Sequence, residues 1–190
     1  MKAQIVNSLA IDTVINRPED KTFQKTSGRI IPAVPGEYYT YSSKFTRESP
    51  VYALLKCKSN KNHPVTFLKD FGCEANLFFL FKENKIQICP IKMAFSHGLL
   101  GHFVDSKVFS DIWLGVSTIT KKFFYEIQLM GEVSDLKKIC RTSCAETKVP
   151  VLLRQESIIT MMTDHGKYGM FLVKDITATS IEIDACHVLV

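Results

Sequence analysis

The stretch from Leu77 to Trp113 constrains the fold of this chain more than any other. It opens with the apolar run Leu77–Phe81, passes the polar tip Lys82–Lys85 and continues as an alternating run, Ile86–Met93. A third apolar segment follows at Gly98–Val104. Apolar runs rich in Phe and Ile that are separated by short polar tips are typical of antiparallel strands. We therefore predict three antiparallel strands in this stretch.

The composition indicates a folded protein rather than a disordered one. Of the 190 residues, 46% are hydrophobic and 23% are charged, which is the balance of ordinary globular domains. No run is apolar for long enough to cross a bilayer, and Met1–Asn7 lacks the apolar core of a secretory signal. We therefore expect an intracellular protein that does not enter a membrane.

The cysteines and the net charge leave several functions open. The cysteines are scattered, mostly inside apolar runs, and we expect them to be reduced thiols that pack as small hydrophobic side chains. They are Cys57, Cys73, Cys89, Cys140, Cys144 and Cys186. The formal net charge of +5 permits an acidic partner such as DNA without requiring one.

Residues 1–50 differ in composition from the remainder of the chain. They contain Pro18, Pro32, Pro35 and Pro50 among several Ser and Thr residues. Frequent prolines among Ser and Thr residues are typical of loops, and we interpret residues 1–50 as an N-terminal extension or linker. Within it, Tyr38–Tyr41 is a candidate short strand or an anchor on the core.

Residues 51–190 are predicted to form the domain, in two half-units of about 51–120 and 121–190. In the first, a strand at Val51–Cys57 precedes a short helix from Asn62 or His63 to Phe71. Pro64 suits the first helical position, where its missing N–H costs nothing. The strands of the Leu77–Trp113 stretch then complete this half-unit.

The second half-unit repeats this order. Phe123–Met130 alternates in part and is predicted to be a strand. Ser134 is a natural N-cap for the helix that follows, whose apolar face is formed by Leu136, Ile139 and Cys140. Four further strands are predicted, with a turn at Asp164–Gly169 whose glycines suit positive backbone torsions. These strands are Val149–Leu153, Ser157–Met162, Met170–Val173 and Ile181–Val190. The sequence therefore predicts a β-rich α+β fold in which a strand-helix-three-strand unit occurs twice in succession.

This double unit resembles the sliding-clamp family, to which proliferating cell nuclear antigen and the DNA-damage checkpoint clamps belong. The resemblance rests on short segments spread over roughly residues 51–184, with one clamp domain present. They are Leu68–Phe71 with Cys73–Ala75, Met93–His97 with Leu99–Leu100, Phe109 with Ile112–Trp113, Leu136–Arg141, and Asp164–Phe171. Ala94 departs from the family, which usually has an acidic residue before the Ser-His pair.

The resemblance implies that two short helices lie side by side on one sheet face and direct cations at the backbone of duplex DNA. The implied DNA-binding residues are Lys58, Lys61 and Lys69 around the first helix, and Lys137, Lys138 and Arg141 on the second. Such phosphate contacts carry no base information and weaken steeply with salt. The alternative is that these cations form an ordinary solvated helix face.

The implied function is a non-catalytic accessory of DNA replication or of the DNA-damage response, which would place the protein in the nucleus. Its partners would be DNA and, through exposed sheet edges, clamp-like subunits or a second copy of the chain. The alternative is a β-rich structural, adaptor or viral matrix-like interaction protein without DNA binding.

Catalysis is not expected, because the motifs of common active sites are missing from the sequence. It contains no C-x-x-C pair, H-E-x-x-H helix, glycine-rich phosphate loop or G-x-S-x-G turn. We therefore expect no catalytic residue, no metal and no cofactor. A cysteine hydrolase built on Cys57 or Cys144 with His97 and Asp105 is a more remote alternative.

Overall fold

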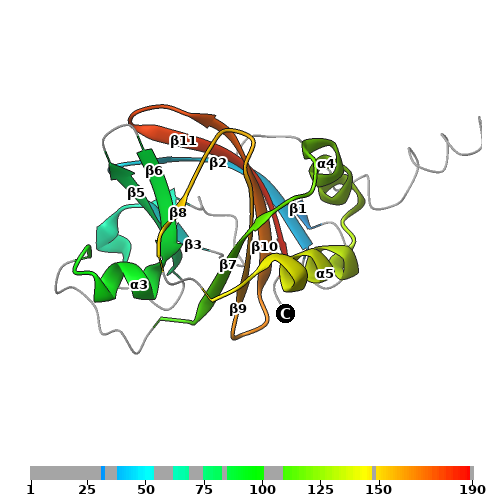
Figure 1. Cartoon of the computed structure of the whole chain (residues 1–190), viewed down its shortest axis with the longest axis horizontal. Helices are drawn as coiled ribbons and strands as arrows, with labels where there is room; N and C mark the ends of the chain where they lie inside the picture. The colour runs from blue at the N-terminus through cyan, green and yellow to red at the C-terminus, as the bar shows by residue number, and fades with distance from the viewer. Residues whose placement is uncertain are drawn as a thin grey trace, which may run out of the picture.

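The computed structural model describes residues 31–32, 38–53, 62–68, 75–82, 85–100, 109–146 and 149–188. In these ranges the chain folds into two antiparallel β-sheets with short helices on their outer sides (Figure 1). The α+β class predicted from the sequence is therefore confirmed at this coarse level.

The larger sheet, here called sheet A, has the strand order β1-β2-β11-β10-β9-β7, and every neighbouring pair is antiparallel. Sheet B has the order β4-β3-β5-β6-β8 and is also antiparallel throughout. The strands of sheet A are β1 (Ile31–Pro32), β2 (Tyr38–Thr46), β7 (Ile112–Ser117), β9 (Ile158–Thr163), β10 (Tyr168–Ile176) and β11 (Ser180–Val188). Those of sheet B are β3 (Val51–Ala53), β4 (Asn62–His63), β5 (Ala75–Lys82), β6 (Lys85–Pro90) and β8 (Val151–Leu152).

The main core lies between the two sheets. Side chains alternate across a strand, so β5 directs Leu77 and Phe79 into this core and Phe78 and Leu80 to the outer side of sheet B. The ring of Phe79 stacks on Phe45 of β2 with centroids 4.4 Å apart and thereby links the two sheets. Both faces of β5 are buried, which explains why its sequence is almost continuously apolar.

Helices cover the outer faces of both sheets. Sheet A is covered by α4 (Lys121–Met130) and α5 (Val133–Ser143), which pack through Phe124, Ile127, Leu136 and Cys140. Sheet B is covered by α3 (Ile91–Ser96) and by the 3₁₀ turn η2 (Val65–Phe67). Layers therefore run helix, sheet A, sheet B, helix, with α3 and the α4–α5 pair at opposite sides of the molecule (Figure 1).

The prediction of a strand at Phe123–Met130 is wrong, because these residues belong to α4. Thr120 caps this helix, its hydroxyl oxygen accepting the Phe123 N–H at 3.2 Å. Gly131 ends it with φ +67°, a left-handed conformation that glycine adopts without a steric penalty. These two local signals and the spacing of the buried residues Phe124 and Ile127 outweigh the partial alternation of the run.

The second strand of the Leu77–Trp113 stretch ends earlier than predicted. Pro90 closes β6, and Ile91–Ser96 forms α3 instead of continuing the strand. A proline has no N–H for a sheet ladder, but it is readily accommodated beside the first turn of a helix. Part of the third predicted strand, Gly98–Leu100, is a turn, and its remaining residues lie outside the described ranges.

The candidate short strand at Tyr38–Tyr41, predicted within the N-terminal extension, is confirmed and continues to Thr46 as the long strand β2. Each of its nine residues pairs with a residue of β11, from Tyr38 opposite Val188 to Thr46 opposite Ser180. These residues therefore belong to sheet A and to the core.

Helix α5 confirms the second predicted helix but begins differently. Its N-cap is Glu132, and Ser134 lies inside the first turn. The predicted turn at Asp164–Gly169 is confirmed between β9 and β10, with Gly166 at φ +73°. Gly169 has no positive φ, and it lies within β10. A Cβ at Gly169 would approach the Cε of Met161 to 2.5 Å, so lack of space explains this glycine better than torsion does.

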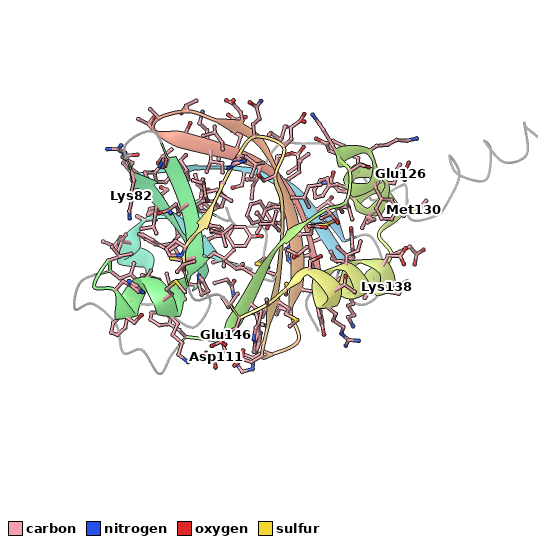
Figure 2. The ribbon with its side chains drawn as sticks, in the orientation of Figure 1. Lys82, Asp111, Glu126, Met130, Lys138 and Glu146 are labelled. Carbon is pink, nitrogen blue, oxygen red and sulfur yellow. The ribbon has the colours of Figure 1, made fainter. Side chains whose placement is uncertain are left out.

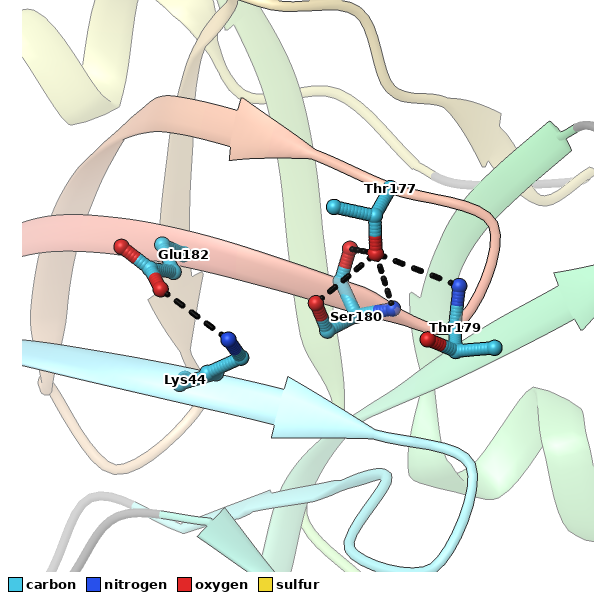
Figure 3. Close-up of polar contacts among 5 residues, drawn as sticks. All are labelled: Lys44, Thr177, Thr179, Ser180 and Glu182. Atoms are coloured by element: carbon cyan, nitrogen blue, oxygen red, sulfur yellow. Dashed lines mark hydrogen bonds and ion pairs between the residues drawn. The ribbon is translucent and has the colours of Figure 1, made fainter.

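The turn between β10 and β11 is closed by the hydroxyl of Thr177. It accepts hydrogen bonds from the backbone N–H groups of Thr179 and Ser180 at 3.3 and 3.0 Å (Figure 3). Beside this turn, Lys44 of β2 and Glu182 of β11 are directly opposite in register and form an ion pair at 3.2 Å. Both contacts fix the β2-β11-β10 register at the end of the sheet that α4 and α5 leave uncovered.

The first predicted helix, from Asn62 or His63 to Phe71, is replaced in its described part by β4 and η2. Leu68, just after η2, is buried in the cluster on the outer side of sheet B, whereas α5 belongs to the cluster on sheet A. The two segments therefore do not share a sheet face. A twofold repeated unit and a clamp-like shape are not confirmed.

Candidate functional site

The six predicted DNA-binding cations do not come together in one described site. Lys58, Lys61 and Lys69 lie outside the described residues. The other three, Lys137, Lys138 and Arg141, all lie on α5. Because the described residues of the first helical segment pack on the other sheet, α5 has no second cationic helix beside it from that segment.

Two of the α5 cations are held against an aromatic ring. The Lys137 Nζ and the Arg141 Cζ each lie 5.6 Å from the ring centroid of Tyr168 on β10, and Arg141 donates a hydrogen bond to the Tyr168 hydroxyl at 3.2 Å. These contacts hold α5 on the sheet. Lys138 is exposed on the outer side of the helix (Figure 2).

An unexpected feature is the apolar outer side of α4. Three large side chains are strongly exposed: Phe123 at 44%, Leu129 at 66% and Met130 at 59% of their full area. Phe123 and Met130 are seven residues apart, about two helical turns, and therefore lie on the same side of the helix. Leu129 lies about 100° further round the helix from Met130, on the other side of Glu126 and Lys122. We call these three exposed residues together the α4 apolar face. Exposed apolar residues that gather on one element mark binding surfaces more often than singly scattered ones do.

The opposite side of α4 is anchored to sheet A by three hydrogen bonds from long side chains. The Tyr38 hydroxyl donates to the Ile127 carbonyl at 2.9 Å, and the Gln128 amide donates to the Ala185 carbonyl at 3.1 Å. The Tyr125 hydroxyl donates to Asp184 at 3.0 Å. With the buried rings and alkyl groups of this side, these bonds fix the orientation of α4, so its apolar face is held outward by the fold.

Charges of both signs lie beside the α4 apolar face and, at Lys122 and Glu126, between its members. Lys121 pairs with Glu156 at 2.9 Å, and Lys122 lies 3.8 Å from Glu126 on the same helix. Glu126, Met130 and Lys138 all lie on the outside of the α4–α5 layer (Figure 2).

Asp184 forms a polar cluster beside α4. Its carboxylate accepts hydrogen bonds from Ser42 and from Tyr125, and it pairs with the Lys174 ammonium at 3.4 Å. Burial, followed by the bond to Asp184, raises the pKa of Tyr125 to about 12. The tyrosine therefore stays protonated and donates to the carboxylate. Each polar group in the cluster has a hydrogen-bond or ion-pair partner within it. The cluster therefore holds α4 on the sheet and does not activate a nucleophile.

The thiols behave as the sequence predicts, as far as the structure describes them. Cys89, Cys140, Cys144 and Cys186 are free. Burial raises the pKa of the Cys89 and Cys186 thiols to about 12 and also raises the pKa of Cys140 and Cys144. A thiol must ionise to act as a nucleophile or to bind a metal, so these groups are poorly suited to either role.

The described residues of the cysteine hydrolase alternative do not lie together in one site. Cys144 contacts Thr160 at 3.5 Å on the sheet A side, whereas His97 caps the end of α3 on sheet B. Cys57 and Asp105 lie outside the described residues. Among the residues that the structure describes, no group of three or more His, Cys, Asp or Glu side chains is arranged to hold a metal ion. In the same part of the chain, every helix is too short or too polar to cross a membrane.

The sheet edges are partly protected. On the outer side of β7, the Ala145 N–H donates to the Leu114 carbonyl at 3.0 Å, and the chain at Ser143 passes so close that a Cβ on Gly115 would lie 2.0 Å from its carbonyl oxygen. On β8, Leu152 is 39% exposed. The α4 apolar face is therefore a stronger candidate for binding than these edges.

The α4 apolar face is not predicted from the sequence, because the partial alternation of Phe123–Met130 indicates a strand. The missed signal is Thr120 before the run and Gly131 after it, with more apolar residues between them than one buried helix side can use.

No known protein family, no curated protein and no solved structure matches this chain.

Proposed function

We propose that this chain is a non-catalytic protein-interaction module that binds a partner protein through the α4 apolar face. The observation that carries the proposal is the exposure of Phe123, Leu129 and Met130 on a helix whose other side is fully used for folding. Side chains of this size are normally buried, and leaving them in water forfeits about 1.5–3 kcal/mol each.

The geometry fits a partner that buries apolar side chains in a polar setting. Phe123 and Met130 mark a stripe of about 10 Å along the helix axis. Lys122 and Glu126 lie between this stripe and Leu129 and supply one charge of each sign. A partner segment with an apolar stripe of its own would complete the layer, as in the recognition of an amphipathic helix.

Site-specific photocrosslinking in cells that naturally make the protein tests this proposal. We expect a photoreactive residue at Leu129 to yield a defined protein adduct, and we expect Phe123→Asp in the same chain to abolish it. The same photoreactive residue at Gln155, which is exposed on a turn, is the matched control. Equal and diffuse labelling from both positions contradicts the proposal.

A second candidate is phosphate-backbone binding by Lys137, Lys138 and Arg141, the part of the sliding-clamp hypothesis that α5 can supply. It is favoured by the presence of three cations on one helix beside Tyr168. Retention on duplex DNA at low salt should weaken when all three residues are neutralised to Gln. The salt dependence should also become shallower, by about 0.9 in slope for each phosphate that the variant no longer binds. Retention that the triple variant does not change rules this candidate out.

A further inference from the structure

We propose that His187 makes the attachment of α4 sensitive to acid: below about pH 6.5 the strand end that carries this histidine opens and releases α4 from sheet A. The inference concerns the two strands that hold α4, so it does not depend on whether α4 binds a partner. It rests on the burial of His187, on the rings that pack against it, and on the bonds that its neighbours form with α4.

The side chain of His187 lies among aromatic rings inside the molecule. It is 0% exposed, and it shares the inner side of β11 with Ala185, which belongs to the core between the sheets. Its ring stacks on that of Tyr39, its partner in the β2–β11 register, with centroids 5.1 Å apart. The ring of Tyr41 meets it edge-on at 5.5 Å. On β10 the residue opposite His187 is Gly169, which leaves room for the imidazole. The site therefore fits a flat, uncharged ring.

The titratable groups that the described contacts place against His187 are tyrosine hydroxyls. Tyr39 and Tyr41 face it from β2, and Tyr41 bonds in turn to Tyr52 of β3. Burial raises the pKa of Tyr41 and Tyr52 above the ordinary value, so neither carries a negative charge at neutral or acidic pH. The charged side chains of the same strands lie on the opposite face of sheet A or in the β9–β10 turn. They are Lys44, Lys174, Glu182 and Asp184 on that face, and Asp164, His165 and Lys167 in the turn.

This site favours the neutral imidazole. An imidazolium would lose its hydration here, and the attraction of a cation to a tyrosine ring replaces only part of that loss. When the strand end opens, the same imidazole is hydrated and takes up a proton below about pH 6.5. The opened state therefore binds more protons than the closed state in this range. Because of this difference, the closed state loses stability as the pH falls.

The neighbours of His187 hold α4. Tyr38, one residue from the strand partner of His187, donates its hydroxyl to the Ile127 carbonyl of α4 at 2.9 Å. Two residues before His187, the Ala185 carbonyl accepts the Gln128 amide of α4 at 3.1 Å. Tyr38 is the first residue of β2, so this end of the ladder can open locally while the remainder of the sheet stays paired. Such an opening moves both groups that hold α4.

The test follows the full-length chain by NMR from about pH 7.5 to about pH 5, a range that spans the titration of an ordinary histidine. The Cε1 signals of ¹³C-labelled histidines report the protonation of each ring. Amide hydrogen exchange, corrected for its intrinsic pH dependence, reports the opening of α4, of residues 38–41 and of β5. We compare the natural chain with His187→Phe, which keeps a flat ring that takes up no proton. The control is His165→Phe, which removes an exposed imidazole.

We expect the His187 signal to stay at its neutral position while the exposed His97 and His165 titrate. Below about pH 6.5, the protection of α4 and of residues 38–41 should fall by up to about tenfold per pH unit in the natural chain and in the control. It should fall much less in β5, and much less everywhere in His187→Phe.

A His187 signal that titrates together with those of the exposed histidines overturns the inference. An equal loss of protection in β5, or in His187→Phe, also overturns it. If His187→Phe does not fold, the natural chain decides the question through its His187 signal and through the difference between α4 and β5.

Discussion

At some positions neighbouring backbone atoms leave no space for a side chain, so only glycine fits. Gly115 of β7 is the clearest case, because the chain at Ser143 passes directly over it. A glycine in a strand often marks such a close approach of another backbone. It also explains how the edge of β7 is shielded by the segment that follows α5.

We predict that Gly115→Ala destabilises the protein by about 1–3 kcal/mol, because the new Cβ would meet backbone atoms that must shift. Urea unfolding measures the loss. Gly169→Ala is the matched control: the atom that its Cβ would meet first is the end of the flexible Met161 side chain, so its loss should be smaller. A Gly115→Ala variant as stable as the natural chain would contradict the packing described for β7.

A second residue-scale prediction concerns the hydroxyls of Tyr41 and Tyr52, which bond to each other in the core. Burial raises the pKa of both above the ordinary value of 10.0. The folded state therefore holds these protons more tightly than the unfolded state. This contribution to stability is complete below about pH 10 and decreases as the pH rises above it.

Urea unfolding between about pH 8 and pH 11.5 tests this expectation. The natural chain should lose stability steeply above about pH 10. Tyr41→Phe/Tyr52→Phe should lose less over the same range, because two of the titrating groups are gone. Identical slopes for the two proteins would show that this pair does not control the alkaline limit.

At the scale of elements, α4 is the feature that determines both the folding and the proposed binding. Its helical state depends on Thr120 at the start and Gly131 at the end more than on the residues between them. The N-terminal turn carries Lys121 and Lys122, which the helix dipole disfavours. The cap and the Lys121–Glu156 pair offset this cost.

We predict that Thr120→Ala destabilises the protein by about 1 kcal/mol through the lost N-cap. Amide hydrogen exchange in the first turn of α4 should accelerate. Thr118→Ala is the control, since Thr118 is exposed and lies just before the cap. If the two substitutions have the same effect, the cap does not determine where α4 begins.

Much of this fold can be predicted from the sequence where one physical signal dominates. β5, β9, the β9–β10 turn, β11 and α5 follow from apolar runs, a glycine turn and a helical spacing. Two segments differ from the prediction for separate reasons. Phe123–Met130 alternates only in part, so its end signals decide its state. Residues 42–46 are mostly polar and extend the candidate strand at Tyr38–Tyr41 through pairing with β11.

Thr120 and Gly131 mark the two ends of α4 in the sequence, but they do not show which of its apolar residues stay exposed. The exposure of Phe123, Leu129 and Met130 depends on which side of α4 faces the sheet, and only packing against Tyr38 and Ala185 fixes that. The cationic residues of α5 were identified correctly as a helix face. Their predicted partner helix is absent from that face among the described residues, because Leu68 packs on the other sheet.

At the scale of the whole molecule, the two sheets share one aromatic core. Phe79 of sheet B stacks on Phe45 of sheet A, and its ring also lies 6.3 Å from Phe171. Neither sheet buries its inner face without the other. The two sheets should therefore unfold together as one cooperative unit.

We predict that Phe79→Ala destabilises the protein by about 3–5 kcal/mol and weakens the exchange protection of β5 and β10 together. Native-state hydrogen exchange reports both strands in one experiment. Leu80→Ala, on the outer side of β5, is the control and should affect the layer formed by α3 first. Loss of protection in sheet B alone after Phe79→Ala would contradict a shared core.

The central claim is that α4 folds through one side and leaves the other side available for a partner. The most direct test is the free energy of unfolding of Leu129→Asp compared with Ile127→Asp, two residues apart on the same helix. Leu129→Asp should change it by less than about 1 kcal/mol, whereas Ile127→Asp, which places a charge in the buried layer, should lower it by more than about 3 kcal/mol. Equal losses for the two variants would show that Leu129 is a core residue, and the proposed interaction face would not exist.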